Sequence, residues 1–190
     1  MVVGLGNPGP DYQATRHNAG FWFLDRWAGI LGLPFRKAWF RPFSFVEARS
    51  DGNRLVLVKP LTFMNRSGDA LPGVLARFDA TADDLVVVFD QMDLPPGRVR
   101  MKPHGSHAGH NGLRSIDAMV GGPYHRIAIG IGRPAAGTTV VDHVLGLPSA
   151  SDRAAVDAVV DRVVPLVDQL WPQGWEPLIH GVNQRNPDSP

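Results

Sequence analysis

Apolar positions along the chain follow two periods, one typical of buried strands and the other of amphipathic helices. Residues 85–89 (LVVVF) are continuously apolar, as in a strand covered on both faces. Residues 18–31 carry apolar side chains at helical spacing, and we expect Asn18 to cap that helix. The same criteria predict strands at 1–5, 43–48, 55–58, 85–89, 98–102 and 126–131, and helices at 18–31, 69–78, 111–120 and 149–170.

Strands and helices alternate through most of this pattern, with one early hairpin whose turn formers lie at 51–53. We therefore expect an α/β fold: a single three-layer domain over 1–190, with a mixed, mainly parallel central sheet flanked by helices. Pro165 should kink or interrupt the longest helix, because proline lacks the N–H that an internal helical position donates. The polar stretch 183–190 is predicted to be a frayed tail.

Composition narrows the class of protein further. The 190 residues include no cysteine, which excludes disulfides, thiolate nucleophiles and cysteine-bound zinc. No apolar run approaches the roughly 20 residues of a membrane span, and no basic stretch precedes the first apolar residues, so we expect a cytoplasmic protein without membrane contact. The net charge of +1 does not mark a nucleic-acid-binding protein, so such a function must rest on local charge.

The segment 4–9 (GLGNPG) matches the dinucleotide-binding pattern G-x-G-x-x-G letter for letter. That pattern binds pyrophosphate when a helix begins within the glycines and points its N-terminus at the phosphates. Here Pro8 and Pro10 interrupt the segment, and helical periodicity begins only after Asn18. The match therefore does not predict nicotinamide or flavin binding.

In an open α/β sheet the site lies beyond the carboxyl ends of the strands, so the loops there are the places to search. The loop after 1–5 carries Asn7, Tyr12 and His17. Taken alone, an asparagine in a loop closes a turn, and a histidine at a helix start is an ordinary surface residue. The other loops change that interpretation.

The segment 62–68 places Phe63 and Met64 among turn-forming residues, with Asn65 directly after them. Two interpretations are open. The apolar pair fills the core while Asn65 caps the next helix, or the pair forms a pocket wall with an amide at its edge.

Asp90 leaves the most buried strand at its carboxyl end, where a carboxylate is well placed to fix a histidine tautomer. The alternative is that it only organises a tight turn. Further on, His104, His107 and His110 recur at a spacing of three. A metal site is disfavoured because the glycine-rich loop around them offers no fixed helical face.

The helix predicted to start at Asn111 follows a strand that carries Arg98, Arg100 and Lys102. A helix N-terminus beside basic side chains suits a phosphate, although an ordinary solvated strand face looks the same in sequence.

Taken together, the loops resemble one family, the bacterial-type peptidyl-tRNA hydrolases. The resemblance covers nearly the whole chain. It implies a monomeric α/β enzyme, without a metal or organic cofactor, that cleaves the ester between a peptide and the 3′ end of tRNA and so recycles tRNA from aborted translation. The stretches that carry it are VGLGNPGPDYQATRHNAGFW, PLTFMNRSG, FDQMDLPPGRVRMK, GHNGLRSI and RIAIGIGRP.

The resemblance also implies roles for single residues. The catalytic set would be His17, its partner Asp90, and Asn7. A family arginine that meets the 5′ phosphate of tRNA falls on Ala128, so that contact is either missing or supplied by Arg126 or Arg133. The residues placed at the substrate are Tyr12 near the terminal adenosine, Phe63, Met64, Asn65, His110, Asn111, and the basic pair Arg100 and Lys102.

We expect a mechanism in which neutral His17 takes a proton from water, and Asp90 stabilises the imidazolium that forms. Amides of Asn7 and Asn65 would share the oxyanion charge, and Asn111 would hold the water or the peptide backbone. A serine nucleophile lacks the G-x-S-x-G motif. Two other classes stay open: a non-catalytic RNA-binding relative and an esterase of small molecules.

Overall fold

The computed structural model describes residues 1–50 and 53–184, so part of the predicted hairpin turn at 51–53 and most of the predicted tail lie outside the described residues. Within them, seven strands form one sheet in the order β2-β3-β4-β1-β5-β7-β6. The strands are β1 (Val2–Gly4), β2 (Arg36–Lys37), β3 (Phe43–Ser50), β4 (Asn53–Pro60), β5 (Val86–Gln91), β6 (Val99–Lys102) and β7 (His125–Gly130).

The centre of the sheet is parallel and its edges are antiparallel. Strand β1 pairs in parallel with both β4 and β5, and β5 pairs in parallel with β7. Strands β2, β3 and β4 form antiparallel pairs on one side, and β6 runs antiparallel to β7 on the other. The predicted mixed sheet with a parallel centre is confirmed.

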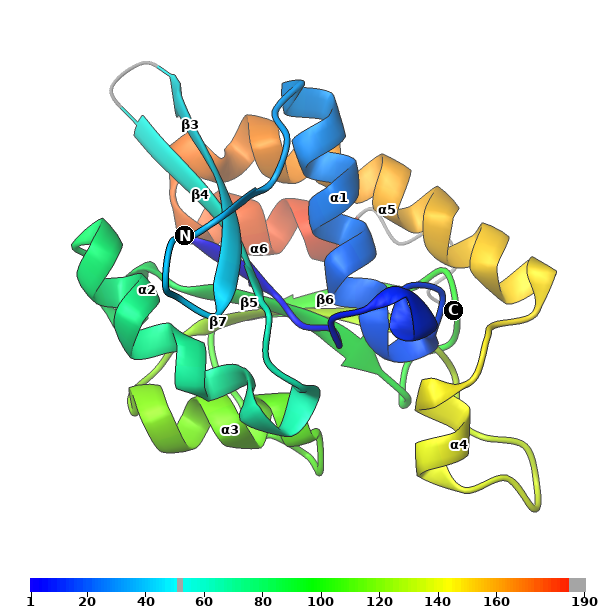
Figure 1. The fold of residues 1–190 in the computed structure, drawn as a ribbon. Helices are drawn as coiled ribbons and strands as arrows, with labels where there is room; N and C mark the ends of the chain where they lie inside the picture. Colours follow the sequence, from blue (N-terminus) through cyan, green and yellow to red (C-terminus); the bar gives the residue numbers. More distant parts are fainter. Residues whose placement is uncertain (51–52, 185–190) are drawn as a thin grey trace.

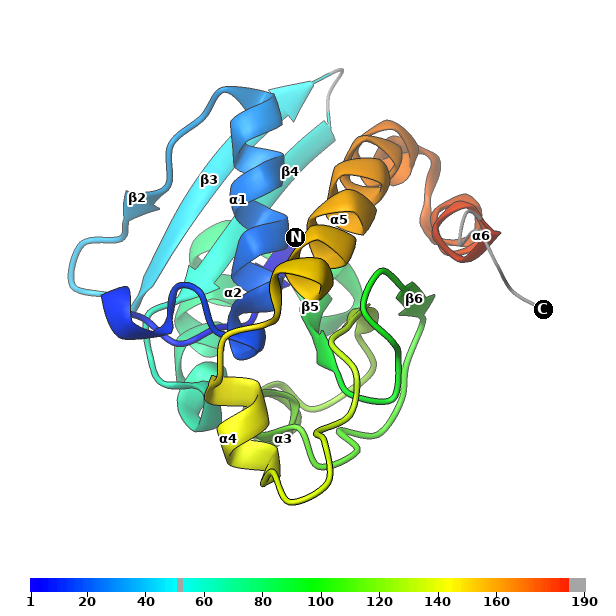
Figure 2. The ribbon, with the colours of Figure 1, turned by 90° about the vertical axis from the view of Figure 1, so that its right-hand side faces the viewer.

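Helices cover both faces of the sheet, which gives the three predicted layers (Figures 1 and 2). Helices α1, α5 and α6 pack on one face, and α2 and α3 pack on the other. The helices are α1 (Ala19–Leu31), α2 (Leu71–Phe78), α3 (Asn111–Val120), α4 (Val140–Leu145), α5 (Ala150–Leu170) and α6 (Trp175–Gln184).

The continuous apolar run of β5 follows from its place in the middle layer. Val86 and Val88 contact the core under α1 and α5, whereas Val87 and Phe89 contact the core under α2 and α3. The edge strand β6 alternates instead: its valine and methionine are buried, and Arg100 and Lys102 are exposed. Both patterns were predicted.

Three local details differ from expectation. Helix α5 passes through Pro165 without interruption. Asn18 occupies the position before α1, yet its side chain makes no capping hydrogen bond because it pairs with another loop. Helix α6 runs to Gln184, two residues into the expected tail, and the Asn183 amide exchanges two hydrogen bonds with the backbone of Met101. Among the described residues, no helix is both long and apolar enough to cross a membrane.

Candidate active site

The glycines after β1 let the chain lie directly against α1. A Cβ added to Gly4 would sit 2.5 Å from the carbonyl oxygen of Gly20, and one on Gly6 would sit 2.6 Å from the ring of Phe21. Helix α1 begins only at Ala19, well after the glycines. The G-x-G pattern therefore serves close packing. No helix begins within the glycines, as predicted.

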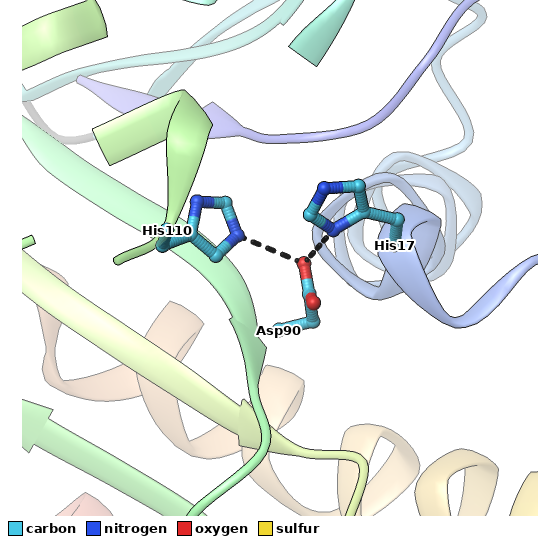
Figure 3. A group of neighbouring side chains, drawn as sticks. All are labelled: His17, Asp90 and His110. Carbon is cyan, nitrogen blue, oxygen red and sulfur yellow. Dashed lines mark hydrogen bonds and ion pairs between the residues drawn. The ribbon is translucent and has the colours of Figure 1, made fainter. Parts of the chain in front are cut away.

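Three side chains from distant parts of the sequence meet at the carboxyl end of β5 (Figure 3). His17 lies in a single 3-10 turn, η2 (Arg16–Asn18), and its Nδ1 is 2.8 Å from Oδ1 of Asp90. His110, directly before α3, places its Nε2 3.0 Å from the same oxygen. Asp90 and His17 are both buried, with 3% and 8% of their surfaces exposed. One carboxylate oxygen thus joins two imidazoles.

The backbone at the start of α3 fixes the tautomer of His110. Its Nδ1 accepts hydrogen bonds from the N–H groups of Gly112 and Leu113, at 3.2 and 3.3 Å, so the proton must reside on Nε2. That Nε2–H donates to Asp90. His110 therefore caps α3 and holds the carboxylate at the same time.

Asp90 in turn orients His17. In neutral His17, Nδ1–H donates to Asp90 Oδ1, which leaves Nε2 with a lone pair. Figure 3 shows that this second nitrogen points away from Asp90. The arrangement gives His17 a free basic atom on the side opposite its carboxylate partner.

The electrostatics of this group favour charge on both Asp90 and His17. Burial alone would raise the pKa of Asp90, but positive charge at His17 and the hydrogen bonds from His110 and His17 hold it well below its usual range. Burial alone would lower the pKa of His17, but the charge and hydrogen bond of Asp90 outweigh it and raise that pKa above 6.5. Asp90 is therefore an anion throughout the neutral range.

Asn7 is fixed on two sides. Its Oδ1 accepts the N–H of Met64 at 2.7 Å, so its Nδ2 remains available as a donor. The backbone N–H and C=O of Asn7 pair with the side-chain amide of Asn18, at 2.9 and 3.0 Å. Asn18 thus joins the loop to itself and does not cap α1 as predicted, a role that nothing in the local sequence marks.

One pocket contains His17, Asp90, His110 and the first residue of α3, Asn111. The valines of α4 form its opposite side, namely Val140, Val141 and Val144. Helix α4 was not predicted, although its start carries a signal: Thr139 accepts the backbone N–H of Asp142, the T-x-x-D pattern of an N-cap. Six residues are too few for a clear helical period.

The remaining predicted substrate residues lie around this pocket. Asn65 is exposed and lines a neighbouring pocket together with Asn111. The ring of Tyr12 packs edge-on against Phe63, with centroids 6.1 Å apart, while Met64 is buried beside Asn7. Phe63 keeps 57% of its surface exposed, so it does not fill the core, which was one of the two interpretations of the Phe63–Met64 pair.

A separate pocket on the β6 side carries the basic residues. The residues that line it include Arg100, Lys102, His104, Arg126 and Ala128. Arg126 is buried and committed: it donates to the carbonyl of Ser106 at 2.7 Å and also to the side chains of Asp117 and Tyr124.

Arg133 lies 2.6 Å from the carboxylate of Asp93 and is not among the residues of this pocket. Both arginines that could replace the charge missing at Ala128 already have partners, and only Arg126 is among the residues that line this pocket. Arg100 of β6 lies directly opposite Ala128 of β7 in the sheet, so the side chains of the two residues are neighbours on the same face.

The sequence disfavoured a metal site formed by His104, His107 and His110. Among the described residues, these three do not form a group whose ligand atoms could share an ion. His104 lines the basic pocket, and His107 accepts the N–H of Gly109. The described residues do bring His17, Asp90 and His110 close enough to hold an ion, with ligand atoms within 4.8 Å of one another. Hydrogen bonds to Asp90 already give both rings a partner there.

Comparison with known proteins identifies the family. A family model for peptidyl-tRNA hydrolase matches residues 1–189. The chain belongs to the peptidyl-tRNA hydrolase family. The peptidyl-tRNA hydrolase of Methylococcus capsulatus is 45% identical over 90% of this chain and 91% of its own length. That of Bordetella avium is 46% identical over 90% of this chain and 84% of its own.

Solved peptidyl-tRNA hydrolases share the fold. The crystal structure of the enzyme from Acinetobacter baumannii superposes with a TM-score of 0.87, at 34% identity over 98% of this chain and 95% of that one. As a member of the peptidyl-tRNA hydrolase family, the chain hydrolyses the ester that links peptide to tRNA. The alternative of a non-catalytic RNA-binding relative is not favoured.

Proposed function

We propose that the enzyme hydrolyses peptidyl-tRNA with a water molecule activated by His17, and that the joint hydrogen bonding of Asp90 to His17 and His110 carries this mechanism. Water gives a proton to Nε2 of His17 and forms a bond to the ester carbonyl carbon. The bond to the ribose oxygen then breaks, and His17 returns the proton to that oxygen. The products are a free peptide and tRNA, and no covalent acyl-enzyme forms.

The two histidines have different roles in this scheme. His17 offers a free Nε2, whereas both nitrogens of His110 are engaged, one with Asp90 and the other with the start of α3. His17 is therefore the base and His110 a positioning residue. An ionised Asp90 stabilises the imidazolium of His17 without taking its proton.

The asparagines supply neutral donors. Because Met64 N–H occupies Oδ1 of Asn7, its Nδ2 donates to the oxygen on which negative charge develops. Asn65 lines the adjoining pocket with Asn111 and does not line the pocket of His17, so we assign it no share of the oxyanion charge. Both amides are assigned to the peptide backbone, whose groups are the same for every amino acid. Such contacts make the enzyme tolerant of the peptide sequence.

The RNA side of the substrate lies toward β6. Arg100 and Lys102 are exposed at a pocket that contains no acidic residue other than Asp93, and we assign them to the 5′ phosphate of the acceptor stem. The edge-on pair of Tyr12 and Phe63 is assigned to the terminal adenosine. Binding through phosphate is salt-dependent and blind to base sequence.

We further assign the enzyme to the cytoplasm as a monomer, with no cofactor. All residues given a role in the mechanism come from one chain and supply both the base and the donors. Its tRNA substrate belongs to translation, which supports that compartment.

The test is release of peptide from purified N-blocked aminoacyl-tRNA, comparing the wild type with His17→Ala. Hydrolysis that requires His17 supports its role as the base. Retained hydrolysis in the variant would show that His17 is not the base and has a structural role. Quenching during turnover gives a second check, since a trapped acyl-enzyme would exclude the activated-water scheme.

A further inference from the structure

The turn between β2 and β3 exposes two large aromatic side chains that the mechanism does not use. Trp39 and Phe40 keep 86% and 98% of their surfaces exposed. Their rings lie edge to face with centroids 6.2 Å apart. Phe40 also has a φ of +56°, a left-handed conformation that side chains rarely adopt. No packing contact within 1–50 and 53–184 requires rings at these positions.

The turn is held firmly despite its exposure. The N–H of Ala38 donates to Phe43, and that of Arg41 donates back to Ala38, at 3.0 and 3.3 Å. The carbonyl of Pro42 accepts the N–H of Leu61 at 2.7 Å. Leu61 lies two residues before Phe63, so the turn is joined to the segment that carries the pocket wall.

The order of the strands places this turn relative to the reaction. Phe43, which follows it, pairs with Pro60 at the carboxyl end of β4, the same end of the sheet at which Asn7 and Asp90 lie. Strands β2 and β6 lie at opposite edges of the sheet with β5 between them (Figure 2). The turn adjoins β2, Asp90 lies near the end of β5, and the basic pocket is lined by Arg100 and Lys102 of β6. The ester thus reacts between the basic pocket and the aromatic turn.

Peptidyl-tRNA extends in opposite directions from its ester, with RNA on one side and peptide on the other. We infer that Trp39 and Phe40 form a subsite for apolar side chains of the nascent peptide, a proposal that rests on the proposed function because it takes the RNA to lie at β6. Exposed rings bind apolar side chains by removing both from water.

Strand spacing sets the reach of this subsite. The turn lies three to four strands from β5, which carries Asp90, or about 14–19 Å at the usual spacing within a sheet. An extended peptide advances about 3.3 Å per residue, so the rings meet the side chain about four to six residues before the ester. A single blocked amino acid does not reach them.

RNA is the competing occupant, because Arg36, Lys37 and Arg41 flank the two rings and would also suit phosphate. The position of the turn decides between them, since it lies at the opposite edge of the sheet from Arg100 and Lys102. Peptide length tests the choice, because a contact with RNA does not depend on it.

The experiment measures kcat/KM for the double variant Trp39→Ala/Phe40→Gly, in which glycine also relieves the left-handed φ. The matched control is Ile30→Ala, another exposed apolar residue, at the far end of α1. Three tRNA substrates share one C-terminal residue: an N-blocked amino acid, a hexapeptide with leucine at upstream positions, and a hexapeptide with glycine there. Unchanged thermal unfolding verifies the fold.

We expect the double variant to lose about fivefold on the leucine hexapeptide, the effect of one exposed aromatic contact, with far smaller changes on the other two substrates. Equal loss on all three would overturn the proposal in favour of RNA contact, and no loss on any would overturn it outright. Failure of the proposed function is seen separately, because Lys102→Glu would then leave all three substrates unaffected.

Discussion

Asp90 and the pair Arg100–Lys102 are the charged groups of the proposed site, but the fold holds them in opposite ways. Asp90 is 3% exposed and accepts two short hydrogen bonds. Arg100 and Lys102 are exposed on an edge strand. A buried charge with fixed partners keeps its position, and that of the ring it binds, to within a fraction of an ångström, and proton transfer requires such precision. Exposed cations on flexible stems attract a phosphate without dictating its geometry.

The comparison predicts that damage at the buried group falls on the chemical step. His17→Ala removes the base, so we expect kcat to fall about 10²–10⁴-fold, with little change in tRNA binding. Single-turnover peptide release and a separate binding titration distinguish the two quantities. A fall confined to binding would reverse the assignment.

Asp90→Asn tests the partner of the base, and we expect a loss of about 10²–10⁴-fold in kcat. The pH profile gives a sharper readout. In the wild type, activity falls as pH drops through the raised pKa of His17, because the protonated ring is not a base. Without the Asp90 charge, burial lowers the pKa of His17, so the acidic limb of the profile moves to lower pH. An unmoved limb would show that another group titrates.

The exposed pair should give a smaller effect of a different kind. Lys102→Glu is expected to raise KM for tRNA substrates about tenfold and to reduce the salt dependence of binding, because one phosphate contact is lost. A minimal ester without RNA serves as the control substrate and should be hydrolysed as before. Equal loss on both substrates would contradict a phosphate contact.

The smallest effect separates the two roles of His110. Asparagine is a good helix cap but too short to reach Asp90, so His110→Asn keeps the start of α3 and loses the contact with the carboxylate. We expect about a threefold to tenfold loss of kcat in His110→Asn. His110→Ala should show the same loss plus about 1 kcal/mol less stability in denaturant unfolding. Equal stability of the two variants would remove the capping role.

Much of the fold was predictable because its signals are local. Strand β5 is apolar throughout because it is buried on both faces, and α1 has apolar residues at helical spacing because it is buried on one face. The pattern of apolar positions in the sequence reveals both. Helix α4 was missed because six residues show no clear period and only Val144 of its three valines is buried in the core, whereas Val140 and Val141 are exposed at a pocket.

For the site, resemblance indicated which residues to expect but not which side chains pair with one another. Resemblance pointed to His17 and Asp90, and the structure brings them within hydrogen-bond distance. The second bond to Asp90 comes from His110, whose place in the sequence gives no sign of it. Arg126 was predicted only as one of two possible replacements for the charge missing at Ala128, and its burial against Asp117 depends on how β7 and α3 pack together. Such pairings arise only when distant segments meet.

The double hydrogen bond between Asn18 and the backbone of Asn7 has a mechanical consequence. Asn18 is the covalent neighbour of His17, so this side chain closes a ring that contains both the proposed base and the proposed amide donor. Thermal motion of the loop then carries the two groups together, like two points on one rigid lever. The distance between the base and the amide donor is therefore set within the loop itself, in addition to the hydrogen bonds that join His17 to Asp90 and Asn7 to Met64.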